Sequence, residues 1–144
     1  MERSAVILVG GKMNYHIIDH RVYYNETDQM GRVYHSNYVI WMEKGRTEFI
    51  RSKGISYKSL EEDGIFLPVA DIDIKFLKAI EYDTDLKIKV ILKEINRIKV
   101  KFRYEIYDEK METLFGIGNT TNIFVGKDGI PKRVSKELVE EIAR

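Results

Sequence analysis

Three stretches of this sequence alternate between apolar and mostly charged residues with a period of two. The stretches run over residues 72–76, 86–92 and 98–104, with Lys, Arg and Asp at most of the intervening positions. This alternation is typical of antiparallel strands that have one buried face and one solvated face. The chain must therefore build a sheet whose apolar face needs a cover.

Two further stretches are rich in β-forming residues and complete the set of expected strands. One runs from His16 to Tyr24, and the other runs from about Glu112 to Val125, followed by turn residues. Gly116 and Gly118 share one face of the last strand, where glycine often marks the close approach of another group. We expect that group to be the substrate or a neighbouring subunit.

One segment has the pattern of a long amphipathic helix. Its apolar positions recur at spacings of three and four residues and comprise Tyr38, Trp41, Met42, Gly45 and Phe49. Ser36 is the expected N-cap, and Gly54 is the expected stop. Trp41, Met42 and Phe49 are interpreted as core residues, with lining of an acyl pocket as the alternative. Two shorter helices are expected. One runs over residues 57–63 and is preceded by Ser56, and the other starts at Ser135.

The order of one strand, one long helix and four strands predicts an α+β fold. A single long helix is the natural cover for the apolar face of a five-stranded antiparallel sheet, so we expect a curved sheet wrapped around one central helix. Residues 16–144 are expected to form one domain. Residues 1–15 are expected to be a poorly ordered N-terminal extension.

Composition narrows the possible functions. The 144 residues carry 24 Lys and Arg against 23 Asp and Glu, so no overall charge favours binding to nucleic acid. The chain contains no Cys and only three His, which argues against disulfides, a thiolate metal site or any other metal centre. No apolar run is long enough to span a membrane. We expect a cytoplasmic protein without a cofactor.

The segment before the long helix carries the chemistry. Asp28 and His35 lie on a loop that leads to the helix N-terminus, where free backbone N–H groups meet a carboxylate. Asp28 could instead be a turn residue, and His35 could only hold the loop. Glu43 is interpreted as a buried or interface partner of a basic residue.

The run from Tyr24 to Arg51 resembles the signature of the 4-hydroxybenzoyl-CoA thioesterase family, most closely its YbgC-like branch. It carries Thr-Asp, Gly, Val-Tyr-His, Asn-Tyr and Trp-Met-Glu-x-x-Arg-Thr-Glu at the spacing of that family. The resemblance implies a hotdog fold, at least a dimer, and hydrolysis of an acyl-CoA without metal or redox cofactor.

The resemblance also implies roles for individual residues. Asp28 matches the catalytic carboxylate, as nucleophile or general base, and the backbone N–H of Tyr34 or His35 would be the oxyanion donor. Substrate-binding roles are expected for Gly31, Asn37, Tyr38 and Phe76. The basic residues Arg97, Lys99 and Lys101 either contact the CoA phosphates or form a solvated sheet face.

Three other functions stay open at this point. The chain could act on acyl carrier protein thioesters, although its His35 context does not resemble the hotdog dehydratases. It could be an acyl-CoA sensor or scaffold that keeps the fold without catalysis. A nucleic-acid module, suggested by the basic strand face, is disfavoured by the balanced net charge.

Overall fold

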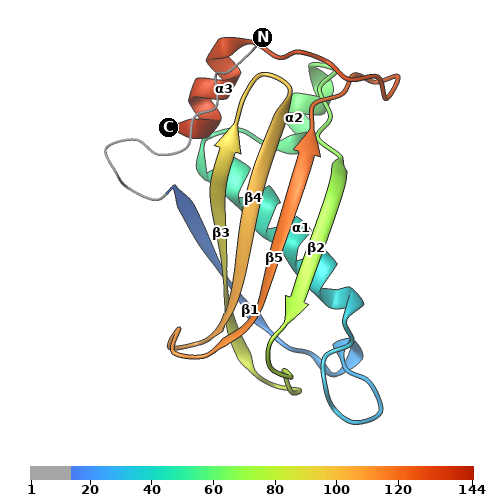
Figure 1. The fold of residues 1–144 in the computed structure, drawn as a ribbon, viewed down its shortest axis with the longest axis vertical. Helices are drawn as coiled ribbons and strands as arrows, with labels where there is room; N and C mark the ends of the chain where they lie inside the picture. Colours follow the sequence, from blue (N-terminus) through green and yellow to red (C-terminus); the bar gives the residue numbers. More distant parts are fainter. Residues whose placement is uncertain (1–13) are drawn as a thin grey trace.

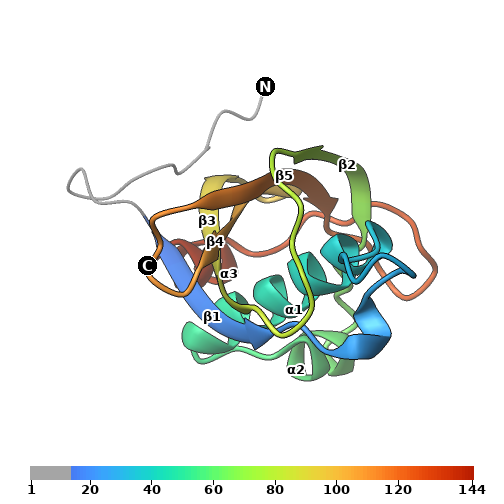
Figure 2. The ribbon, with the colours of Figure 1, turned by 90° about the horizontal axis from the view of Figure 1, so that it is seen from below.

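The computed structural model describes residues 14–144, which form a curved antiparallel sheet with a long helix lying along its concave face (Figures 1 and 2). The strand order is β1-β3-β4-β5-β2. The strands are β1 (Tyr15–Arg21), β2 (Val69–Phe76), β3 (Asp85–Ile95), β4 (Lys99–Asp108) and β5 (Leu114–Ile123). The helices are α1 (Ser36–Ser52), α2 (Tyr57–Glu62) and α3 (Lys136–Ala143), and Tyr24–Glu26 forms a short 3-10 helix.

The alternating pattern decides which side of the sheet faces α1. The apolar positions of β3 and β4 are buried against the helix, whereas Lys87, Lys89, Lys99 and Lys101 lie on the opposite face and are half-buried. From α1, the side chains of Trp41, Met42 and Phe49 are at most 1% exposed. The expected α+β fold, the curved sheet around one helix and the core role of these three residues are confirmed.

Gly116 and Gly118 allow α1 to approach β5 closely. A Cβ atom on Gly116 would lie 2.9 Å from the ring of Tyr38, and one on Gly118 would lie 2.7 Å from the terminal methyl of Met42. The expectation of close approach was therefore correct, but its cause was wrong. The group that needs the space is the chain's own helix, because these glycines face inward.

Several element boundaries differ from the sequence prediction. The first strand ends at Arg21 because Val22 turns into the core and residues 24–26 coil into the 3-10 helix. Ser36 is the first residue of α1 rather than its cap, since His35 occupies the cap position without a side-chain hydrogen bond. The last strand is shorter than expected at both ends, spanning Leu114–Ile123.

The other predicted helix start and stop residues are confirmed. The Ser56 hydroxyl accepts a hydrogen bond from the N–H of Ser59, and the Ser135 hydroxyl accepts one from Leu138. Gly54 follows α1 with a φ of 81°, a left-handed conformation that suits glycine at a helix end. Within residues 14–144, no helix is long and apolar enough to cross a membrane.

The N-terminal prediction is tested only in part. Tyr15 is the first residue of β1 and pairs with Ile91, so the sheet begins one residue before the expected boundary. The expected poor order of residues 1–15 falls mostly on residues 1–13, which lie outside the described residues.

Candidate active site

Asp28 lies in a tight turn that connects the 3-10 helix to α1. Its Oδ1 accepts hydrogen bonds from the backbone N–H groups of Met30 at 2.8 Å and Arg32 at 3.2 Å. The turn closes through Gly31, whose φ of 75° favours glycine, and whose N–H donates to the carbonyl of Asp28. The carboxylate is exposed and held in place by these backbone hydrogen bonds, so Asp28 is a turn residue whose carboxylate remains open to solvent.

Glu26 anchors this turn to the rest of the molecule. Its carboxylate accepts hydrogen bonds from the Trp41 indole at 2.8 Å and the Tyr23 backbone N–H at 2.8 Å, and it lies 3.0 Å from His20 Nε2. Burial raises the pKa of Glu26, but the hydrogen bonds from Tyr23, Trp41 and His20 outweigh it and hold the pKa below its usual value. Glu26 is therefore an ionised, half-buried anchor between β1, the turn and α1.

The helix N-terminus offers one backbone donor next to the turn. The N–H of Tyr34 already donates to the carbonyl of Glu26 at 2.8 Å. Within the described chain, the N–H of His35 donates to no backbone carbonyl, as expected at a helix start. Of the two donors considered from the sequence, His35 is the one that is free to bind a ligand oxygen.

A cavity of about 480 Å³ joins these groups, and we call it the Asp28 cavity. The ring of Phe76 at the end of β2 stacks edge-on against Tyr38 at 4.8 Å, and burial raises the pKa of Tyr38 to about 12. Both polar and aromatic side chains thus line the cavity. The lining residues are Asp28, Arg32, Val33, Tyr34, His35, Tyr38, Phe76, Leu77, Lys78, Ala79 and Ile80.

Two of the expected substrate-binding residues do not line this cavity. Gly31 closes the Asp28 turn through its own backbone N–H, and Asn37 donates from its amide to the carbonyls of Glu26 and Tyr34 at 2.9 and 3.1 Å. Both residues therefore support the loop. Glu43, expected to be buried or at an interface, is exposed on α1 in the isolated chain.

The predicted phosphate-binding residues lie far from the Asp28 cavity within one chain. Arg97, Lys99 and Lys101 belong to the turn between β3 and β4 and to the start of β4, at the opposite end of the sheet from the Asp28 turn (Figure 1). Arg97 donates to the carbonyl of Val134 at 2.7 Å, and Lys99 lies 3.6 Å from Glu94. The structure does not bring these residues to the candidate site of their own chain.

Two basic residues that sequence reasoning missed do line the cavity. Arg32 and Lys78 are exposed there, and within residues 14–144 neither forms an ion pair with a carboxylate. The position of Arg32 beside Gly31 in the recognised motif was an available signal. No sequence signal pointed to Lys78, because it follows β2, far along the chain from the motif, and only the folding of the chain brings it to the cavity.

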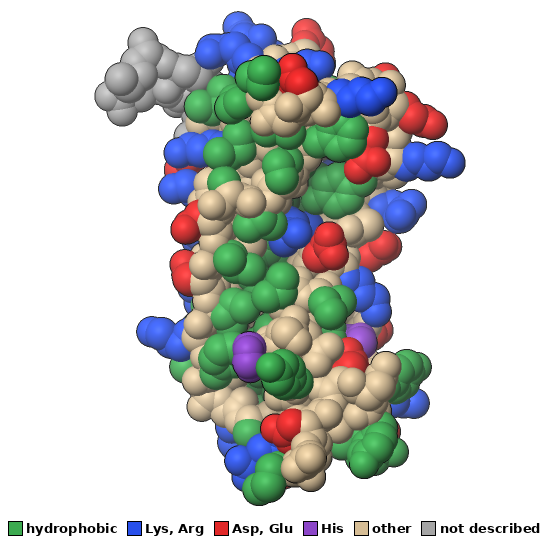
Figure 3. Space-filling view, turned by 90° about the vertical axis from the view of Figure 1, so that its right-hand side faces the viewer, with side chains coloured by type: hydrophobic (Ala, Val, Ile, Leu, Met, Phe, Trp, Pro, Cys, Tyr) green, Lys and Arg blue, Asp and Glu red, His purple; other side chains and the backbone are tan. Residues whose placement is uncertain are grey.

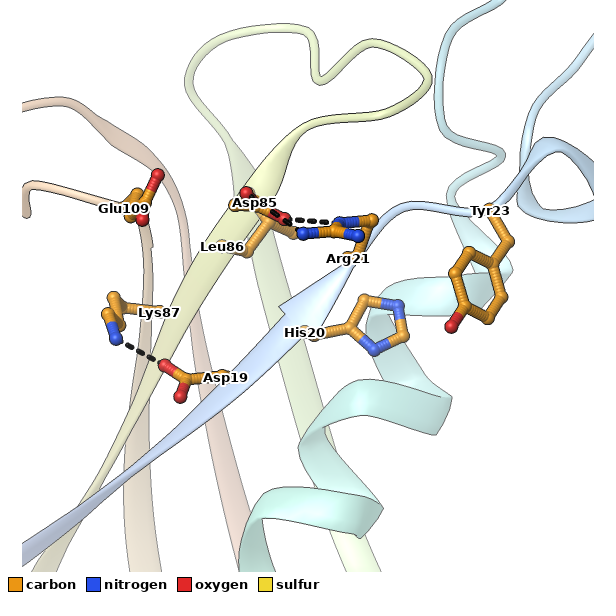
Figure 4. A pocket seen from close by; sticks show the side chains of 8 residues that line it. All are labelled: Asp19, His20, Arg21, Tyr23, Asp85, Leu86, Lys87 and Glu109. Carbon is orange, nitrogen blue, oxygen red and sulfur yellow. Dashed lines mark hydrogen bonds and ion pairs between the residues drawn. The ribbon is translucent and has the colours of Figure 1, made fainter.

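A second hollow lies where β1 meets β3 (Figure 4). Four of its charged residues form two pairs: Arg21 Nε lies 2.7 Å from Asp85, and Lys87 binds Asp19, which leaves Glu109 as the one lining carboxylate without an ion pair among the described residues. Such exposed pairs leave little unmet charge for a ligand. Within the described residues, no cluster of three or more His, Asp or Glu side chains could hold a metal ion.

The curved antiparallel sheet wrapped around one central helix defines a hotdog fold, and the Asp28 carboxylate lies in a cavity beside the start of that helix. The profile of the thioesterase-like superfamily matches residues 22–142, and the chain belongs to this superfamily.

Individual relatives agree with that assignment. YneP of Bacillus subtilis is 41% identical over 87 residues, covering 60% of this chain and 63% of YneP. The acyl-CoA thioesterase YbgC of Helicobacter pylori is 33% identical over 87 residues, covering 60% and 63%. The chain thus spans less than two thirds of these two relatives. A DHNA-CoA thioesterase structure from Staphylococcus aureus is 37% identical, with a TM-score of 0.78 over 83% of this chain and 80% of that one. The resemblance to YbgC-like proteins is confirmed.

Proposed function

We propose that this protein hydrolyses an acyl-CoA thioester to the free acid and CoA. The observation that carries the proposal is the exposed Asp28 carboxylate, held by two backbone N–H groups in the same cavity as the His35 helix start. The names of the relatives YbgC and the Staphylococcus aureus enzyme support the same reaction. We also propose that the protein is cytoplasmic, as expected from the sequence.

The chemistry needs only groups of this chain. With Asp28 as general base, the carboxylate takes a proton from water, and the hydroxide oxygen attacks the thioester carbon. The His35 N–H would donate to the oxyanion of the tetrahedral intermediate. Collapse breaks the carbon–sulfur bond, and the thiolate of CoA leaves and takes up a proton.

The nucleophilic alternative uses the same residues. Asp28 would attack the thioester carbon directly and expel the CoA thiolate, and water would then hydrolyse the resulting mixed anhydride. Both routes regenerate the carboxylate. In both, Tyr38 and Phe76 would line the path of the acyl group, and Arg32 and Lys78 would attract the CoA phosphates.

We also propose that the active form is an oligomer built through β2. Strand β2 is an edge strand with almost every residue exposed, and apolar side chains form a band along that side of the molecule (Figure 3). Val69, Ile72 and Phe76 of β2 and the following Leu77 are exposed apolar residues, and α1 also exposes Val39 and Ile40. Pairing two β2 strands across a two-fold axis would satisfy the open edge and bury these side chains.

Thiol release from a panel of acyl-CoAs tests the proposed reaction. We expect stoichiometric CoA and free acid from at least one member of the panel, and loss of the activity in Asp28→Asn. Binding of acyl-CoAs without thiol release would instead support a non-catalytic sensor. Release only from acyl carrier protein thioesters would change the carrier but keep the chemistry.

A further inference from the structure

His20 on β1 lies outside the Asp28 cavity, yet its ring contacts the segment that carries Asp28. Its Nε2 atom lies 3.0 Å from each carboxylate oxygen of Glu26. The side chains of His20 and Glu26 are only 12% and 14% exposed. Figure 4 shows the His20 ring pointing from β1 toward Tyr23. The proposed hydrolysis, as described above, gives this histidine no role.

The surroundings of the His20 ring determine which of its nitrogens carries a proton. An ionised carboxylate can only accept hydrogen bonds, so Nε2 must carry the proton that is donated to Glu26. The other nitrogen, Nδ1, lies 3.4 Å from Nζ of Lys44 on α1, and an ammonium group can only donate. Nδ1 therefore accepts from Lys44. With its proton on Nε2, the ring joins β1 both to α1 and to the Glu26 carboxylate.

The three hydrogen-bond partners of the Glu26 side chain come from different parts of the fold. Tyr23 belongs to the adjoining loop, Trp41 to α1, and His20 to the sheet. The Trp41 bond fixes the Glu26 carboxylate relative to the helix, and the His20 bond fixes it relative to β1. Within the described residues, His20 is the only partner that the sheet supplies to this carboxylate.

The backbone of Glu26 connects this anchor to both reactive groups. Asp28 follows Glu26 by two residues, and its N–H donates to the carbonyl of Arg32 at 2.7 Å, which closes the turn. The Glu26 carbonyl accepts from the N–H of Tyr34 at 2.8 Å, next to the donor at His35. A displaced Glu26 would therefore change the distance between the Asp28 carboxylate and the His35 N–H.

The Asp28 cavity needs this anchor because its lining comes from both layers of the fold. Phe76 belongs to the sheet, whereas His35 and Tyr38 lie at the start of α1. A carboxylate that is held only by its own turn and by the helix could shift relative to the sheet. A misplacement of about 1 Å can lower a reaction rate by about 100-fold, so such a shift would act on turnover.

We propose that His20 is a positioning residue for the reaction at Asp28. By holding Glu26 against β1, it keeps the Asp28 turn in a fixed place relative to the sheet side of the cavity. This inference rests on the proposed thioesterase function and adds to it a residue that does not touch the substrate.

Substitutions of His20 separate positioning from substrate binding. His20→Leu removes the donor to Glu26, whereas His20→Gln keeps an N–H donor at the end of the side chain. We expect His20→Leu to lower kcat for acyl-CoA hydrolysis by about tenfold or more. The KM should change by less than about twofold, because His20 does not line the cavity. His20→Gln should recover most of the lost kcat.

His16→Leu is the matched control. His16 lies on the same face of β1 as His20, and its ring makes no hydrogen bond within residues 14–144. The variants are compared by steady-state kinetics and by thermal melting. An unchanged kcat in His20→Leu would overturn the inference. A loss of kcat that His16→Leu reproduces, or that His20→Gln does not recover, would overturn it as well.

A double-variant cycle tests the route through Glu26. If His20 acts by holding the Glu26 carboxylate, His20→Leu should lower kcat little further in a protein that already carries Glu26→Gln. Losses that multiply in the double variant would show that the two residues act independently, which would refute positioning through Glu26.

Hydrogen exchange separates this inference from the proposed reaction, because it needs no substrate. The backbone N–H groups of Met30, Arg32 and Tyr34 are hydrogen-bonded around the turn, so their exchange rates report how firmly it is held. We expect these groups to exchange about tenfold faster in His20→Leu and near the wild-type rate in His20→Gln and His16→Leu. Equal exchange in all four proteins would reject the positioning role. Absence of thiol release in wild type, with the expected exchange pattern, would reject only the reaction.

Discussion

The indole N–H of Trp41 donates a hydrogen bond to the Glu26 carboxylate over 2.8 Å. Trp41 lies on the buried face of α1 and is 1% exposed. The backbone carbonyl of Glu26 accepts hydrogen bonds from the N–H of Tyr34 and from the side-chain amide of Asn37. This one contact therefore links the buried face of the helix to the turn that carries Asp28. The position of the candidate carboxylate depends on the core as well as on its own loop.

The lowered pKa of Glu26 predicts a specific dependence of stability on pH. A carboxyl whose pKa is lower in the folded state stabilises the fold above its unfolded value, near 4.5, and loses that contribution as the pH falls through the folded value. In Glu26→Gln the melting temperature should be lower near neutral pH and should fall less steeply below about pH 4.5. Glu48→Gln, at an exposed ion pair of α1, is the control. Parallel melting curves for wild type and Glu26→Gln would contradict the assigned role.

Asp28→Asn should lower turnover by at least about 100-fold while leaving the melting temperature nearly unchanged. Asparagine keeps the Oδ1 acceptor for the N–H groups of Met30 and Arg32 but is neither a base nor a nucleophile. Asp128→Asn is a matched control, because Asp128 accepts from the N–H of Ile130 in a similar turn elsewhere. Thiol release and thermal melting are measured together. Near-normal turnover would remove Asp28 from the mechanism, and a lower melting temperature would favour a turn role.

The cavity geometry predicts which cations bind CoA. Changing Arg32 and Lys78 to Ala should raise KM for acyl-CoA by about tenfold, and much less for the matching acyl-pantetheine, which lacks the nucleotide phosphates. The Lys99→Ala and Lys101→Ala double variant serves as the comparison. An effect confined to that double variant would restore the prediction made from the sequence, and equal effects on both substrates would exclude a phosphate role for either pair.

Gly116→Ala should destabilise the fold by about 1–3 kcal/mol, because the new methyl group would crowd the Tyr38 ring and lie 3.2 Å from the carbonyl oxygen of Lys75. Gly118→Ala should cost less, since it meets the flexible end of Met42. Because Tyr38 lines the Asp28 cavity, the Gly116 variant should also lose activity at temperatures where it is still folded. Denaturant unfolding and thiol release measure the two effects. A larger loss of stability for Gly118→Ala would show that the helix contact is placed differently.

If the site forms across paired β2 strands, specific activity should fall as dilution separates the subunits. Ile72→Lys, which puts a cation at the middle of the exposed edge, should shift the protein toward monomer and lower activity to the same extent. Lys87→Ala, on the outer face of the sheet, should change neither. Sedimentation and activity are followed over one concentration range. A monomer with full activity per chain would refute the oligomeric site.

Local periodicity determined most of the fold. The two-residue alternation of β3 and β4 and the helical spacing of Trp41, Met42 and Phe49 show directly which faces are buried, because side-chain direction repeats with the backbone. The motif around Asp28 likewise predicted a loop before the long helix, and the structure has a turn at this position. Spacing along the chain carries no distance information, so the sequence could not show that Arg97, Lys99 and Lys101 lie far from Asp28 within one chain.

Only the tertiary structure decided which distant residues meet. It placed Lys78 in the same cavity as Asp28, buried Arg46 against the Tyr104 hydroxyl, and showed that Gly116 and Gly118 make room for α1. These relationships depend on sheet order and on the packing of helix against sheet. Residue patterns report the direction of a side chain, whereas hydrogen bonds and cavities depend on what lies across from it, and that is set by contacts between segments far apart in the chain.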